Sequence, residues 1–72
     1  MKIGRDPGQC QLALQDPNVS SLHAFIACRK GQWVMQDMNS TNGTFVNGAK
    51  ISTVGLKNGD RIKFGMTVQA KI

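Results

Sequence analysis

Three polar segments of this 72-residue chain carry the side chains that could do chemistry. Residues 40–48 read Ser-Thr-Asn-Gly-Thr-Phe-Val-Asn-Gly, with two Asn-Gly pairs. Each pair is a strong signal for a tight turn, because both residue types tolerate positive φ. The other two segments are Ser20-Ser21-Leu22-His23 and Gly4-Arg5. Hydroxyls, amides, backbone N–H groups and a guanidinium suit an anion or an extended peptide, and we expect the segments to converge at one end of a β-fold.

Ser20 and His23 are not expected to act as a catalytic pair. Nucleophilic catalysis needs an acid that orients the base and donors that stabilise an oxyanion, and this Ser-x-x-His pair brings neither. The only acids are four aspartates, and the last three are expected at turns or strand ends: Asp6, Asp16, Asp37 and Asp60. Because the chain has a single histidine, we also expect no metal site, and no other cofactor is indicated.

Length and charge restrict the class of protein. The length allows one domain, expected over residues 1–72. Nine Lys and Arg against four Asp give a net charge of +5, which favours an anionic partner such as phosphorylated protein, nucleic acid or a membrane surface. The basic residues are scattered, and Trp33 with three Phe makes no aromatic platform, so nucleic acid is not the expected partner. The longest apolar run, residues 24–28, is too short to span a membrane.

The two cysteines indicate the cellular compartment. Cys10 and Cys28 form no Cys-x-x-Cys pair, and we expect both to be small buried residues in a reducing environment, with a disulfide as the alternative. The first residues, Met-Lys-Ile-Gly-Arg, lack the apolar stretch of a signal peptide. The chain is therefore expected to be soluble and intracellular, in the cytoplasm.

The elements that position the polar segments are predicted to be short strands. Apolar residues often alternate with period two, and no window keeps a helical period. Strands are predicted at residues 12–14, 24–29, 32–37, 44–46, 49–51, 61–64 and 67–72. In the last of them, Val68, Ala70 and Ile72 are expected to point inward. Short strands with frequent turn signals predict an antiparallel sandwich or barrel.

Four sequence segments with recognisable motifs follow one another between residues 3 and 65. They read Ile3-Gly4-Arg5, Asp16-Pro17-Asn18-Val19-Ser20-x-x-His23-Ala24, Asp37-x-Asn39-Ser40-Thr41-Asn42-Gly43-Thr44-Phe45-Val46-Asn47-Gly48 and Leu56-x-x-Gly59-Asp60-x-Ile62-x-x-Gly65. Together they resemble the forkhead-associated (FHA) domain, whose members are β-sandwiches that bind phosphothreonine peptides through loops at one end. The resemblance implies a small all-β sandwich of FHA type that recognises a threonine-phosphorylated protein. The alternative is a phosphate-independent assembly module on the same fold.

The resemblance also implies a role for each matched residue. Arg5 would pair with the phosphate, and Ser20 would donate its hydroxyl to it. Thr41 would add a phosphate contact, and Asn42 would hydrogen-bond the peptide backbone. Ser21 stands where relatives mostly carry Arg, Lys or Asn, so its contact with phosphate or peptide is expected to be weaker.

Further residues would support the site through the architecture of its loops: Gly4, His23, Gly43 and Asn47. The resemblance implies that His23 braces the loops, that the glycines allow backbone shapes closed to other residues, and that Asn47 holds its turn. Relatives carry further strands before the Gly-Arg pair. The chain is therefore expected to be a fragment of a larger protein, or to gain the missing sheet edge from a partner or by self-association.

Overall fold

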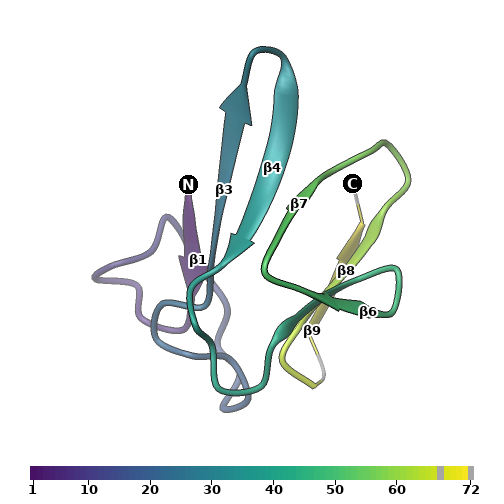
Figure 1. Ribbon diagram of the computed structural model, residues 1–72. Helices are drawn as coiled ribbons and strands as arrows, with labels where there is room; N and C mark the ends of the chain where they lie inside the picture. Colours follow the sequence, from purple (N-terminus) through teal and green to yellow (C-terminus); the bar gives the residue numbers. More distant parts are fainter. Residues whose placement is uncertain (67, 72) are drawn as a thin grey trace.

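The computed structural model describes residues 1–66 and 68–71 (Figure 1). Within these residues the chain forms strands, turns and loops but no helix, so none is present that is long and apolar enough to cross a membrane. This confirms the all-β class. In chain order the strands are β1 (Lys2–Gly4), β2 (Leu12–Ala13), β3 (Ala24–Arg29), β4 (Gln32–Asp37), β5 (Thr44–Val46), β6 (Ala49–Ile51), β7 (Thr53–Gly55), β8 (Arg61–Phe64) and β9 (Val68–Lys71).

Two sheets make up the fold, with strand orders β2-β1-β3-β4-β7 and β6-β5-β8-β9. Figure 1 shows β3 and β4 in one layer, with β6, β8 and β9 in the other. Neighbouring strands are antiparallel except for β1 and β2, which run parallel with Ile3 opposite Leu12. Both sheets contribute to one buried apolar core: Ile3, Val19, Ala24, Met35, Val46, Leu56, Ile62 and Phe64. The predicted β-sandwich is thus confirmed.

Most predicted strands are found, several with unchanged bounds. The patterns at 24–29, 32–37, 44–46, 49–51 and 61–64 correspond to β3, β4, β5, β6 and β8. The predicted strand at 12–14 is the shorter β2. Sequence reasoning missed β1 and β7, because three residues are too few to show a period.

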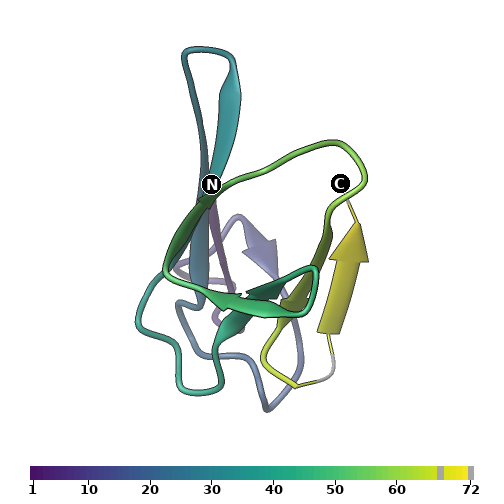
Figure 2. The same cartoon turned by 45° about the vertical axis from the view of Figure 1, so that its right-hand side comes forward.

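The last strand differs from its prediction. β9 covers Val68–Lys71, while Thr67 and Ile72 lie outside the described residues. Val68 packs against the core as expected, whereas Ala70 is exposed. Ala70 shares the inward face with its partner Ile62. In the described part of the chain β9 is an edge strand of its sheet (Figure 2), so Ala70 has a neighbouring strand on one side only.

Two-residue turns set the register of two hairpins. Lys30 and Gly31, which join β3 to β4, have φ of 51° and 78°. Asn47 and Gly48, which join β5 to β6, have φ of 53° and 85°. Two successive positive φ values are typical of a type I′ turn, which matches the twist of paired strands. The predicted Asn-Gly turn at 47–48 is confirmed.

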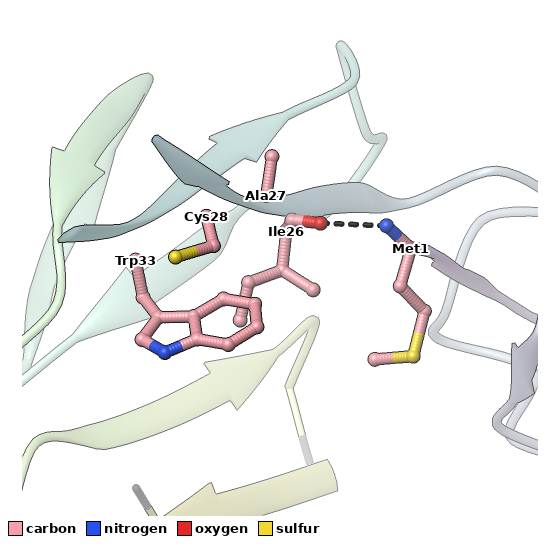
Figure 3. A pocket seen from close by; sticks show the side chains of 5 residues that line it. All are labelled: Met1, Ile26, Ala27, Cys28 and Trp33. Atoms are coloured by element: carbon pink, nitrogen blue, oxygen red, sulfur yellow. Dashed lines mark hydrogen bonds between the residues drawn. The ribbon is translucent and has the colours of Figure 1, made fainter. Parts of the chain in front are cut away.

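The β3–β4 hairpin extends beyond the body of the sandwich, as Figures 1 and 2 show. An apolar groove (Figure 3) lies between this hairpin and the N-terminus and is lined by Met1, Ile26, Ala27, Cys28 and Trp33. The Trp33 side chain is 52% exposed. The groove remains open because the opposite sheet does not reach this part of the hairpin.

The cysteines lie in different surroundings. Both are free, as predicted, but only Cys10 is buried, and its thiol contacts the carbonyl of Ser21 at 3.2 Å. Cys28 is exposed in the groove, so its predicted burial is wrong. A period-two pattern indicates which face a residue occupies but not whether another layer covers that face.

Because thiol reactivity depends on exposure, an excess of a thiol-specific reagent should modify Cys28 in the native protein and leave Cys10 unmodified. Absorbance of the released product should report about one thiol per native chain and about two in denaturant. Cys28→Ser should abolish the rapid modification seen in the native protein. Rapid reaction of two thiols in the native protein would contradict the placement of Cys10.

Candidate functional site

The His23 side chain is fully buried and joins two loops. Its Nδ1 accepts the backbone N–H of Ser20 at 3.0 Å, so Nε2 carries the ring proton and donates it to the carbonyl of Gly43 at 2.8 Å. The ring also meets Phe64 edge to face, with centroids 5.8 Å apart. One imidazole thus holds the segment before β3 against the segment before β5.

The backbone of His23 extends the same connection to two more elements. Its N–H donates to the carbonyl of Ile3 in β1, and its carbonyl accepts the N–H of Met38 just after β4. The two distances are 2.8 Å and 2.9 Å. Every polar group of this buried residue therefore has a partner, as burial requires.

Ser20 lies where three segments meet. Its Oγ accepts the backbone N–H of Thr41 at 3.0 Å, and its carbonyl accepts the N–H of Arg5 at 2.9 Å. The neighbouring carbonyl of Ser21 accepts the N–H of Asp6 at 3.2 Å. Because a hydroxyl that accepts one hydrogen bond still has a proton to donate, Ser20 can also serve a ligand.

Asn42 makes a second connection between the loops. Its Nδ2 donates to the carbonyl of Asn18 at 2.9 Å, and its side chain is half-buried. This bond uses one of the two N–H groups of the amide, and a side-chain amide has further capacity as donor and acceptor. The bond fixes the orientation of the amide.

Arg5 is the cation at this end of the sandwich. It is exposed, and its Nη1 donates to the carbonyl of Pro17 at 3.4 Å, a long bond that leaves most of the five guanidinium donors to other partners. The preceding glycine permits this loop to pack closely: a Cβ on Gly4 would lie 2.3 Å from the carbonyl oxygen of Ser21.

The remaining support residues act on single turns. Gly43 has φ of 88°, a conformation that side chains rarely adopt, and this directs its carbonyl to His23. Asn47 donates from its amide to Asp60 at 3.0 Å and accepts the N–H of Arg61 at 3.1 Å. Asn47 therefore stabilises the pairing of β5 with β8 and lies outside the loop cluster.

Asp37 has a structural role that sequence reasoning missed. Its carboxylate accepts hydrogen bonds from the hydroxyl of Ser40 at 2.5 Å, the N–H of Ser40 at 3.1 Å and the hydroxyl of Thr44 at 2.8 Å. Ser40 Oγ in turn accepts the N–H of Gly43 at 3.0 Å. Burial raises the pKa of Asp37, but these hydrogen bonds outweigh it and the pKa is lowered. The Asp-x-x-Ser spacing was the available signal.

The structure thus places the five predicted site residues together at the loop end of the sandwich: Arg5, Ser20, Ser21, Thr41 and Asn42. In Figure 1 the loops that carry these residues lie at the lower end, opposite the tip of the β3–β4 hairpin. The described residues contain no group of three or more His, Cys or Asp that could hold a metal ion.

This geometry is accompanied by sequence similarity along nearly the whole chain. The model of the FHA domain family matches residues 1–65. The chain therefore belongs to the FHA domain family.

Individual relatives extend the comparison. The chain is 35% identical over 68 residues to an FHA domain-containing protein of Arabidopsis thaliana, covering 90% of this chain and 18% of that protein. A solved FHA domain studied for phosphothreonine-dependent interactions is similar with a TM-score of 0.83 and 39% identity, over 89% of this chain and 66% of that one. The chain is also similar to the FHA domain of MEK1, solved in complex with a HOP1 phosphothreonine peptide. That comparison has a TM-score of 0.81 and 33% sequence identity, and it covers 89% of this chain and 71% of that one. The chain thus spans about a fifth of that curated relative.

His23→Ala should destabilise the fold, because it leaves the N–H of Ser20 and the carbonyl of Gly43 without their partner. The expected loss in free energy of unfolding is about 1–3 kcal/mol, measured by urea denaturation. Ser21→Ala, at an exposed neighbour, is the matched control and should change stability little. An unchanged midpoint in His23→Ala would contradict the bracing role.

Asp37→Asn tests the carboxylate that orders residues 37–44. Because the folded pKa is lowered, Asp37 stabilises the fold above its unfolded pKa, and this contribution is lost as the pH falls through the folded pKa. The variant should be less stable than the wild type at pH 7, and the difference should shrink between about pH 5 and pH 3. Denaturation at several pH values measures it. A difference that stays constant down to pH 3 would contradict the assignment.

Proposed function

We propose that this FHA domain recognises a phosphothreonine-containing segment of a partner protein through the loop end of the sandwich. The observation that carries the proposal is the position of Ser20. It accepts hydrogen bonds from the backbone N–H groups of Arg5 and Thr41, and its own N–H donates to the buried ring of His23. The solved complex of a similar domain with a phosphothreonine peptide supports it.

The chemistry of the cluster suits a phosphate. The guanidinium of Arg5 can present two parallel N–H groups to two phosphate oxygens, and such charge-assisted bonds are about twice as strong as neutral ones. Ser20 adds its hydroxyl proton, and the exposed Thr41 adds a second hydroxyl. The three groups come from different loops, so their relative positions depend on the His23 connection.

The neighbouring residues suit the rest of the peptide. Asn42, oriented by its bond to Asn18, offers its remaining N–H and its carbonyl oxygen to a peptide backbone. Ser21 is exposed beside Ser20, and its short hydroxyl reaches less far than the longer side chains that the FHA resemblance places there. We therefore expect a moderate affinity.

We infer a binding module and not an enzyme. Both ring nitrogens of His23 are used in loop contacts within the buried interior, so this histidine is unsuited to act as a base for Ser20. Two free cysteines and a phosphorylated ligand support an intracellular setting. Phosphate-independent assembly remains the second candidate, favoured by the exposed Trp33 in the apolar groove.

Arg5→Ala should weaken phosphothreonine-peptide binding at least about tenfold, because charged hydrogen bonds contribute about 1.5–3 kcal/mol. Wild-type affinity should be micromolar, about −8 kcal/mol at 1 μM, in calorimetric titrations. Lys30→Ala, which removes an exposed charge at the tip of the β3–β4 hairpin, is the control and should bind as the wild type does.

The unphosphorylated twin of the peptide completes this experiment. It should bind far more weakly than the phosphorylated form. Equal affinity for the two peptides would contradict phosphate recognition and would favour the assembly module.

A further inference from the structure

The outward face of the β6-β5-β8-β9 sheet carries a row of cations around one aromatic ring. Phe45 pairs with Lys50 on one side and with Lys63 on the other, and Lys63 pairs with Gln69. Directly opposite residues of antiparallel strands share one face. The ammonium of Lys63 lies over the Phe45 ring, 5.0 Å from its centroid.

A second row lies beside the first on the same face. Arg61 pairs with Lys71 across β8 and β9, and both side chains are exposed. Like charges directly opposite each other on a sheet destabilise it. An anion placed between them would relieve this repulsion. We refer to Lys50, Phe45, Lys63, Arg61 and Lys71 as the basic face.

The carboxylates of the chain are occupied elsewhere. In the described structure each aspartate accepts hydrogen bonds from nearby groups of the chain: Asp6 from Gly8 and Gln9, Asp16 from Asn18, Asp37 from Ser40 and Thr44, and Asp60 from Lys57 and Asn47. The outward positions of β5, β6, β8 and β9 include no acid. Four of the nine cations of the chain therefore share a face on which no carboxylate stands.

The basic face is continuous with the proposed peptide site. A depression of about 370 Å³ is lined by Thr41, Asn42, Phe45, Lys63, Gly65 and Met66. Its first two residues belong to the loop cluster, and the next two belong to the basic face. A second depression, of about 220 Å³, continues past Phe45 and Lys63 to Arg61 and Gln69. The two depressions share Phe45 and Lys63, so an extended polypeptide leaving the loop cluster could pass from one to the other.

We propose that the basic face binds acidic residues that flank the phosphothreonine in the same partner polypeptide. The inference rests on the proposed function and specifies its ligand: a phosphothreonine with an Asp- or Glu-rich stretch on one side. Because the basic face adjoins Thr41 and Asn42, we expect its ligand to be an extended continuation of the peptide bound there. Because the face is positively charged, we expect that continuation to be rich in acidic residues.

Two other occupants fit less well. A second copy of the chain also carries a net charge of +5, so its approach through this face is opposed by repulsion. Single-stranded nucleic acid needs aromatic rings on which successive bases stack, and the face offers only Phe45, already covered by Lys63. The acidic peptide is therefore the favoured partner, and the oligonucleotide becomes a control.

Three phosphothreonine peptides that differ only in their flanks test the proposal: acidic residues before the phosphothreonine, acidic residues after it, or Asn and Gln on both sides. One acidic flank should tighten binding about five- to tenfold at low salt, since exposed charge pairs are individually weak and act together here. The gain should decrease as salt rises.

Arg61→Gln combined with Lys63→Gln should reduce the ratio of acidic-flank to neutral-flank affinity to about one. Its affinity for the neutral-flank peptide should stay within about twofold of the wild type, which also shows that the variant is folded. Lys30→Gln, at the distant hairpin tip, is the matched control and should keep the full ratio.

The possible outcomes are distinct. Equal affinity for all three flanks, or a ratio unchanged by the double variant, overturns the basic-face proposal while leaving phosphothreonine recognition intact. Equal affinity for phosphorylated and unphosphorylated peptides instead overturns the proposed function itself. A single-stranded oligonucleotide that binds through Arg61 and Lys63 more tightly than the acidic-flank peptide would assign the face to nucleic acid and overturn the proposal as well.

Discussion

The buried imidazole of His23 is the interaction on which the binding end depends. The loops that it joins contain mostly polar residues, which gain little from hydrophobic burial. Each ring nitrogen is bonded to the backbone of a different loop, so separating the loops would leave buried polar groups without partners. This cost keeps Ser20 and Thr41 within hydrogen-bond distance, although 20 residues separate them in the chain.

Three surfaces with different chemistry surround the small core. The loop end carries Arg5 and hydroxyls, the β6-β5-β8-β9 sheet carries the basic face, and the β3–β4 hairpin carries the apolar groove around Trp33. The first two are continuous, whereas the groove lies at the opposite end. The domain can therefore select a phosphorylated segment and its charged flank together.

The parts of the fold that were predictable from the sequence are those set by local chemistry. The Asn47-Gly48 turn and strand β8 follow from residue types and alternation, because positive φ and a two-sided strand leave clear patterns. The exposure of Cys28 and Ala70 was not predictable, since it depends on how far the opposite sheet extends. The partners of His23 also join distant segments, so only the resemblance indicated its role, and nothing in the chain specified which atoms it contacts.

The most direct test of the account is a nuclear magnetic resonance titration of the ¹⁵N-labelled domain with a phosphothreonine peptide. We expect the largest shifts at the backbone amides of Arg5, Ser20 and Thr41, with the indole N–H of Trp33 unchanged. The unphosphorylated peptide should cause little change. Largest shifts at Trp33 and the β3–β4 hairpin, or equal shifts with both peptides, would contradict the claim that the loops held by His23 form a phosphothreonine site.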